Sequence, residues 1–295
     1  MTRARWTGIA AVLAAAVLWG STGTVQTALP DAREPLVVGA LRLAIGALAL
    51  LALALSRPDT RRGLARLPWR GVLFAGIAIG AYNLLFFRAV SDAGVGVGTA
   101  VTIGSAPIWA TAWEIAWDRR WPGRLRGGAQ GLAVLGVGLL GLGGGTGGTA
   151  GQGVALALAA GACYAAYSLA TSRVGRGVPS TSLAAGTFVV AAALAAPVLA
   201  LAPLGWLGAP GVWGPLIFLG IGATGLSYAL YTWGLTRMAA STGVTLALAE
   251  PVTALVLAVW IVGERLTGLG VLAAGTILAG LAVVALVPAP RAPQG

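Results

Sequence analysis

The side chains best suited to bind a ligand are hydroxyl and aromatic groups that recur at helical spacing inside long apolar stretches. Tyr164, Tyr167 and Ser168 follow one another at i, i+3 and i+4, so they share one face of a helix. Tyr228 and Tyr231 repeat this spacing in a later stretch. A phenol in hydrocarbon needs a partner for its hydroxyl, so a tyrosine far from a membrane interface faces protein or water more often than lipid.

These faces predict a central cavity lined by aromatic rings and hydroxyl groups. Hydrogen bonds would hold a zwitterion in such a cavity, and aromatic faces would hold an apolar side chain. The alternative is packing between helices, in which Ser and Thr hydroxyls bond to helix carbonyls. The residues predicted to bind substrate are Trp19, Tyr82, Asn83, Ser105, Trp109, Tyr164, Tyr167, Ser168, Tyr228 and Tyr231.

Glu250 lies deep in an apolar stretch, and Pro251 follows it. An ionisable group inside a bilayer is costly, which makes Glu250 a candidate for function. The proline frees a backbone carbonyl near Ala247 and predicts a kink there. Two roles stay open for this pair: a carboxyl that titrates and couples transport to protons, or one that shapes the kink and takes part in gating, which we favour.

Two other charged positions receive structural interpretations. Arg42 lies within a predicted span, where its long side chain can snorkel or pair with a carboxylate. Glu114 lies close to Asp118 and Arg119, which predicts an ion pair at the surface.

The composition predicts an integral membrane protein. The chain has 295 residues, of which 58% are hydrophobic and 9% are charged, whereas soluble domains average about 25% charged residues. At roughly 20 apolar residues per crossing, the chain has room for about ten helices. We predict an all-α fold with spans at 8–28, 35–55, 71–90, 93–117, 128–145, 151–171, 181–203, 212–236, 241–262 and 267–287.

The composition also excludes several function classes. The chain has no His and a single Cys, Cys163, so zinc, haem and iron–sulfur sites lack their usual ligands, and we expect no metal and no cofactor. A GxxxxGK[ST] phosphate loop is absent from the sequence, which argues against an ATP motor. The net charge of +11 comes from Arg residues between the apolar segments, where they indicate orientation in a membrane rather than nucleic-acid binding.

The arginines predict that orientation. With the N-terminus inside, fifteen Arg residues lie in inside segments, and three, Arg33, Arg88 and Arg265, lie outside. The positive-inside rule therefore predicts that both termini are cytoplasmic. Met1–Arg5 is basic, but a full-length apolar span without a clear cleavage site follows it, so we expect a retained helix and no signal peptide.

The chain also divides into two similar halves. The segment Gly141–Gly153 is rich in glycine and has no charge, so it is the predicted junction. Pro107 aligns with Pro251 at an offset of 144 residues. We predict two five-helix repeats, 1–147 and 148–295. Because five is odd, the second repeat is inverted, and such repeats rock between outward- and inward-open forms around a site near the midplane.

Three features match a known pattern: the segment around Trp19–Gly20, Arg42 in the second span, and the stretch from Ala249 to Val284 that holds Glu250–Pro251. In these features the sequence resembles the drug/metabolite transporter superfamily, in particular its ten-helix EamA-type members, and it is most similar to the bacterial exporters of aromatic and other amino acids. The first half departs from the pattern, because Ala106–Pro107 stands where the second half has Glu-Pro.

The resemblance implies a secondary transporter rather than an enzyme. It would export neutral and aromatic amino acids and related metabolites across the bacterial inner membrane by alternating access. The alternative in the same superfamily is a multidrug or other small-metabolite exporter. A membrane enzyme that acts on lipid would need clustered acids, a His or a metal, and a scaffold needs no cavity. We expect a monomer in the bilayer, whose partner is its small-molecule substrate.

Overall fold

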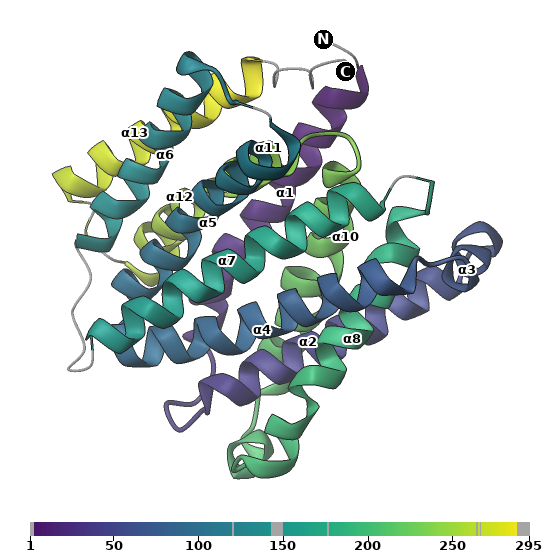
Figure 1. The fold of residues 1–295 in the computed structure, drawn as a ribbon. Coiled ribbons are helices and arrows are strands. Elements are labelled where there is room, and N and C mark those ends of the chain that lie inside the picture. The colour runs from purple at the N-terminus through teal and green to yellow at the C-terminus, as the bar shows by residue number, and fades with distance from the viewer. Residues whose placement is uncertain are drawn as a thin grey trace.

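The computed structural model describes residues 3–119, 121–142, 150–175, 177–263, 265 and 267–287. Within these residues every regular element is a helix, and the helices pack into a bundle (Figure 1). Their bounds are α1 (Arg3–Gln26), α2 (Pro35–Leu55), α3 (Pro58–Ala65), α4 (Trp69–Ala93), α5 (Val95–Asp118), α6 (Arg124–Leu142), α7 (Ala150–Val174), α8 (Ser180–Leu201), η1 (Gly205–Gly208), α9 (Trp213–Ile217), η2 (Phe218–Leu226), α10 (Ser227–Leu235), α11 (Ala240–Leu246), α12 (Ala249–Leu257), η3 (Ala258–Val262) and α13 (Gly268–Leu286).

Eight helical segments among the described residues are long and apolar enough to cross a membrane. They coincide with eight of the predicted spans: α1, α2, α4, α7, α8 and α13 are single helices, and Trp213–Leu235 and Ala240–Val262 are composite. The helices α5 and α6 overlap the other two predicted spans, 93–117 and 128–145. The short helix α3 was not predicted, because its polar, Arg-containing sequence has no apolar periodicity.

The two composite segments differ in continuity. From Trp213 to Leu235, α9 passes into the π-helix η2 and then into α10 without a turn. Between α11 and α12 the helix is interrupted by a short turn, in which the Glu250 N–H donates to the carbonyl of Ala247 at 2.9 Å. Pro251 has no N–H to continue the helix, which favours this interruption. The kink predicted near Ala247 is therefore confirmed, although the carbonyl of Ala247 is not left free.

Glycines allow the helices to approach one another closely. A Cβ atom on Gly76 of α4 would lie 2.7 Å from the backbone oxygen of Thr187 in α8. A Cβ atom on Gly136 of α6 would lie 2.8 Å from the backbone oxygen of Ala273 in α13. Real side chains do not fit at such distances, so these glycines let backbones pack directly against each other.

Arginine side chains tie the end of α13 to other helices. Arg5 of α1 donates to the carbonyls of Ala285 at 2.8 Å and Val287 at 3.0 Å. Arg126 of α6 donates to the Val287 carbonyl at 2.8 Å and to the hydroxyl of Thr242 in α11. The last carbonyls of a helix have no partner within it, and cations are favoured beside them. The start of α1 and the end of α13 therefore lie at the same end of the bundle (Figure 1).

Candidate substrate-binding site

Seven aromatic rings from five helices meet inside the bundle, and we call them the aromatic cluster. The ring of Trp19 in α1 lies 4.8 Å from that of Tyr228 and 5.1 Å from that of Tyr231, both in α10. These centroid distances lie in the range of attractive aromatic pairs. The members of the cluster are Trp19, Tyr82, Tyr164, Tyr167, Phe188, Tyr228 and Tyr231. All of them are buried except Tyr82, which is partly exposed.

Part of the cluster serves packing between α7 and α10. The hydroxyls of Ser168 and Tyr231 lie 3.0 Å apart, and those of Tyr167 and Thr232 lie 3.2 Å apart. Ser168 also donates to the carbonyl of Tyr164 at 2.9 Å. The packing interpretation thus accounts for these hydroxyls, whose partners lie in the protein.

Several other buried polar groups lack such partners, the hydroxyl of Tyr164 in the cluster among them. Neither the indole N–H of Trp19 nor the amide oxygen of Asn83 has a hydrogen-bond partner among the residues that the structure describes. Trp19 is 5% exposed and Asn83 is 4% exposed. A buried polar group without a partner costs about 1–3 kcal/mol. A ligand that supplied an acceptor to the Trp19 N–H would remove that cost.

The structure brings two of the predicted lining residues to other places. The hydroxyl of Ser105 donates to the carbonyl of Thr102 at 3.2 Å, and its side chain packs against Gly161 where α5 meets α7. Trp109 is 43% exposed, and the ring contacts of the aromatic cluster do not include it. The geometry therefore favours a packing role for Ser105 and places Trp109 outside the ring contacts of the cluster.

Arg42 comes close to the cluster, although the sequence indicated only a structural role for it. The residue is 7% exposed, and its Nε donates to the hydroxyl of Thr224 at 3.0 Å. Thr224 in turn donates to the carbonyl of Leu219 at 2.8 Å, inside the π-helix η2. The sequence indicates a polar face at Tyr228 and Tyr231, and Thr224 lies one turn before it. For Phe188, in the apolar helix α8, the sequence gives no indication of a place in the cluster.

Glu250 lies in the first turn of α12, directly after the interruption. Its side chain is partly exposed, and the backbone oxygen of Glu250 faces Gly20 of α1. Thr224, the partner of Arg42, lies four residues before Tyr228, and Gly20 follows Trp19, so both ionisable groups lie near the aromatic cluster. Pro251, also partly exposed, continues α12 away from this point.

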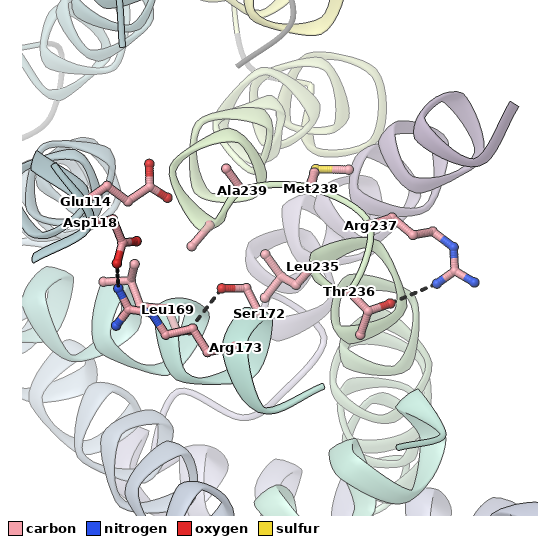
Figure 2. A pocket seen from close by; sticks show the side chains of 11 residues that line it. Glu114, Asp118, Leu169, Ser172, Arg173, Leu235, Thr236, Arg237, Met238 and Ala239 are labelled. Atoms are coloured by element: carbon pink, nitrogen blue, oxygen red, sulfur yellow. Dashed lines mark hydrogen bonds and ion pairs between the residues drawn. The ribbon is translucent and has the colours of Figure 1, made fainter. Parts of the chain in front are cut away.

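A polar pocket of about 480 Å³ lies beside the cluster (Figure 2). It is lined by the ends of α5, α7 and α10 and by the loop to α11. Leu169 and Leu235 form part of its wall. Leu169 is two residues after Tyr167 in α7, and Leu235 is four residues after Tyr231 in α10. At its rim Arg173 of α7 donates to Asp118 of α5 at 2.7 Å. Arg237 and Met238 line the pocket and pack against Gly8, near the start of α1. The pocket therefore lies at the end of the bundle where α1 begins.

The surface ion pair predicted for Glu114 is wrong. Glu114 is 8% exposed, and its carboxylate accepts hydrogen bonds from the Ser241 N–H at 3.0 Å and from the Ser241 hydroxyl at 2.6 Å. Free backbone N–H groups at the start of α11 favour a carboxylate there. Asp118 pairs with Arg173 instead of with Arg119, because α7 packs against α5 at this end (Figure 2).

The EamA-like transporter family matches residues 6–142 and again residues 151–286. The chain belongs to this family. EamA-like transporters are part of the drug/metabolite transporter superfamily, so the resemblance noted from the sequence is confirmed.

The relatives are bacterial transporters that align over most of their length. The chain is 38% identical to the uncharacterized transporter YwfM of Bacillus subtilis over 278 residues, which cover 94% of this chain and 93% of YwfM. It is 32% identical to the threonine/homoserine exporter RhtA of Escherichia coli K12 over 284 residues, 93% of this chain and 90% of RhtA. One solved crystal structure superposes on this chain with a TM-score of 0.81, and the match covers 95% of this chain and 96% of the chain in that structure. Because the two sequences are 24% identical, this likeness shows the fold alone.

Proposed function

We propose that this EamA-family membrane protein exports neutral amino acids, aromatic ones included, and related small metabolites across the bacterial inner membrane. The aromatic cluster beside the polar pocket is the observation that carries the proposal. Its rings offer apolar contact to a side chain, and the unpartnered indole N–H of Trp19 offers a hydrogen bond. The name of RhtA, a threonine/homoserine exporter, supports the amino-acid class.

The proposed mechanism is alternating access by two inverted repeats of five spans each. Matched contacts support it. Gly76 of α4 faces Val190 of α8, and Gly220 of η2, 144 residues later, faces Ile45 of α2. Likewise Gly136 of α6 faces α13, and Gly280 of α13, again 144 residues later, faces α6. In each pair of contacts, the second is the first with the roles of the two halves swapped. A two-fold axis that relates the halves would produce such pairs.

The Arg-rich end of the bundle is proposed to be cytoplasmic, in line with the positive-inside rule. Arg5, Arg126, Arg173 and Arg237 lie at this end, which is also the end where the polar pocket opens. The structure then corresponds to a form in which a solute enters the pocket from the cytoplasm. The aromatic cluster lies beyond it, on the way to the other side.

Efflux from proteoliposomes tests the proposal. Vesicles with the purified protein are loaded with labelled Trp, Phe, Met, Thr or Leu, and efflux is followed with and without a pH gradient. Efflux of several of these amino acids, with competition among them, is expected. Trp19→Ala should lower the rate at least about tenfold, because it removes central ring contacts, each worth about 0.5–1.5 kcal/mol. Trp260→Ala is the matched control, since Trp260 is 85% exposed.

A multidrug exporter of cations is the second candidate, and the intramembrane carboxylate of Glu250 favours it. Such a protein would carry amines that have no carboxylate, and Glu250→Gln would abolish their transport. Vesicles that release none of the five amino acids but do release a lipophilic amine would overturn the amino-acid proposal.

A further inference from the structure

Two opposite charges lie inside the bundle without being paired to one another. Arg42 of α2 bonds to Thr224, four residues before Tyr228, and the ring of Tyr228 lies 4.8 Å from that of Trp19. The backbone oxygen of Glu250 in α12 faces Gly20, the residue after Trp19. Among the described residues, the ion pairs include neither of them. Both groups thus lie near the aromatic cluster, and they form no ion pair with each other.

The hydrogen bonding of Arg42 leaves its outer nitrogens free. Its Nε donates to Thr224, whose hydroxyl is itself fixed by the Leu219 carbonyl. This anchor orients the guanidinium, and the two terminal nitrogens donate to no group among the described residues. These nitrogens form a planar fork that matches a carboxylate. Arg42 is 7% exposed, so its guanidinium is a buried charge whose two terminal nitrogens are available to bind an anionic ligand.

Glu250 presents the complementary group. No described residue donates a hydrogen bond to its carboxylate. The turn between α11 and α12 holds Glu250 at the start of α12, where the helix dipole stabilises negative charge. Tyr228, four residues after the Arg42 partner Thr224, belongs to the aromatic cluster, and so does Tyr82.

We propose that Arg42 and Glu250 form the head-group site for a zwitterion: the terminal nitrogens of Arg42 bind the α-carboxylate of an amino acid, and the carboxylate of Glu250 binds its α-ammonium group. The side chain of the amino acid then points into the aromatic cluster. This inference rests on the proposed export of amino acids. It assigns Arg42 a binding role and gives Glu250 a role besides shaping the helix.

The physical reason is that the buried guanidinium and the partly exposed carboxylate both lack a partner, and only a zwitterion supplies one to each. A carboxylic acid without an amine would satisfy Arg42 and leave Glu250 alone, whereas an amine without a carboxylate would do the reverse. Leaving one charge of a buried set unpaired is strongly unfavourable. The site should therefore select for the two head groups together, and only weakly for the side chain.

Competition with matched analogues tests this assignment. Flux of labelled phenylalanine is measured against unlabelled phenylalanine, phenethylamine and 3-phenylpropionate, and flux of labelled threonine against threonine, 1-amino-2-propanol and 3-hydroxybutyrate. In the wild type the amino acid should compete at least about tenfold better than either analogue, the effect of one charged hydrogen bond. In Arg42→Gln the advantage over the amine should fall to about one while the advantage over the acid persists, and Glu250→Gln should show the reverse.

This crossed pattern separates binding from a structural role, because a merely damaged fold lowers flux without changing which analogue competes. Arg88→Gln and Glu34→Gln are controls with the same chemical change elsewhere, and they should keep both ratios. If Arg42→Gln does not elute as a folded monodisperse protein, Arg42→Lys takes its place, and its ratio against the amine should still fall.

The outcomes distinguish this inference from the function on which it rests. Amino-acid flux in the wild type with unchanged ratios in both variants would overturn the head-group site and leave the exporter standing. Absence of amino-acid flux from folded wild-type protein would overturn both. Better competition by the amine than by the amino acid in the wild type would also overturn the head-group site and favour a cation exporter.

Discussion

Two helical segments carry a proline at matched positions, but only one of the two helices is interrupted there. Pro107 lies inside α5, which runs without interruption over 24 residues. At Pro251 the chain instead turns between α11 and α12. In α5 the amide of Gln130 donates to the Pro107 carbonyl at 2.6 Å, so α6 braces the helix beside its proline. Proline alone therefore does not decide whether a helix breaks, because one proline lies in a continuous helix and the other at a turn.

The residue before each proline sharpens the contrast. Ala106 is fully buried against α7, whereas Glu250 carries a charge and is partly exposed. The position matched to Arg42, at the same offset of 144, is Gly186. Arg42 lies in the first half and Glu250 in the second, and neither has a charged counterpart at the matched position, whereas the glycine contacts recur in both halves. The repeated contacts serve packing, and the unrepeated charges are where we expect the substrate to bind.

The largest expected effect comes from giving α5 the acid of the other segment. Ala106→Glu would bury an unpaired carboxyl at the contact of α5 with α7, at a cost of at least about 3 kcal/mol. The unfolding temperature in detergent should fall sharply, or folded protein should be lost. Ala106→Ser is the control, since it adds one atom without a charge. An Ala106→Glu protein as stable as the wild type would mean that the two segments are interchangeable.

A smaller effect is expected from removing each proline. Pro251→Ala restores an N–H and allows α11 and α12 to join, which displaces Glu250 and should reduce amino-acid flux about tenfold, equivalent to about 1.4 kcal/mol. Pro107→Ala acts on a helix that is already continuous, so flux should stay within about twofold of the wild type. Both are measured as efflux from vesicles with equal amounts of folded protein. Equal losses in the two variants would remove the functional distinction between the segments.

The smallest effect is expected at the end of α5. Asp118 and Arg173 pair at 2.7 Å, but their side chains are 29% and 40% exposed, and exposed pairs contribute about 0–1 kcal/mol. Asp118→Asn should lower the free energy of unfolding by less than about 1 kcal/mol. A double-mutant cycle with Arg173→Gln measures the coupling. A large loss of flux at unchanged stability would instead show that the rim of the pocket takes part in transport.

The helical segments were predictable because hydrocarbon allows few solutions for a backbone. A chain that must satisfy its own hydrogen bonds in lipid forms long apolar helices, and runs such as Pro35–Leu55 show this directly in hydropathy. The tyrosines were predictable for a related reason: Tyr164, Tyr167, Tyr228 and Tyr231 carry hydroxyls that avoid lipid, and all four lie in the aromatic cluster.

Other parts of the site depended on which helix faces which, and periodicity does not contain that information. Trp109 follows Ser105 at i+4, yet one is exposed and the other packs under Gly161. The sequence predicts a snorkelling side chain or an ion pair for Arg42, whereas in the structure its Nε donates to Thr224 of η2. Glu114 reads as a surface acid until the start of α11 reaches its carboxylate. In each case the deciding partner lies more than 100 residues away or on another helix.

The opposite signs of Arg42 and Glu250 have an electrical consequence. A positive and a negative group carried together across the membrane field sum to zero, and so does an amino-acid zwitterion. For a transport cycle without a coupled ion, the membrane voltage does no net work on the empty site or on the loaded one. Direction would then follow the concentration ratio of the solute alone, and a cell that accumulates an amino acid would release it whatever its membrane potential.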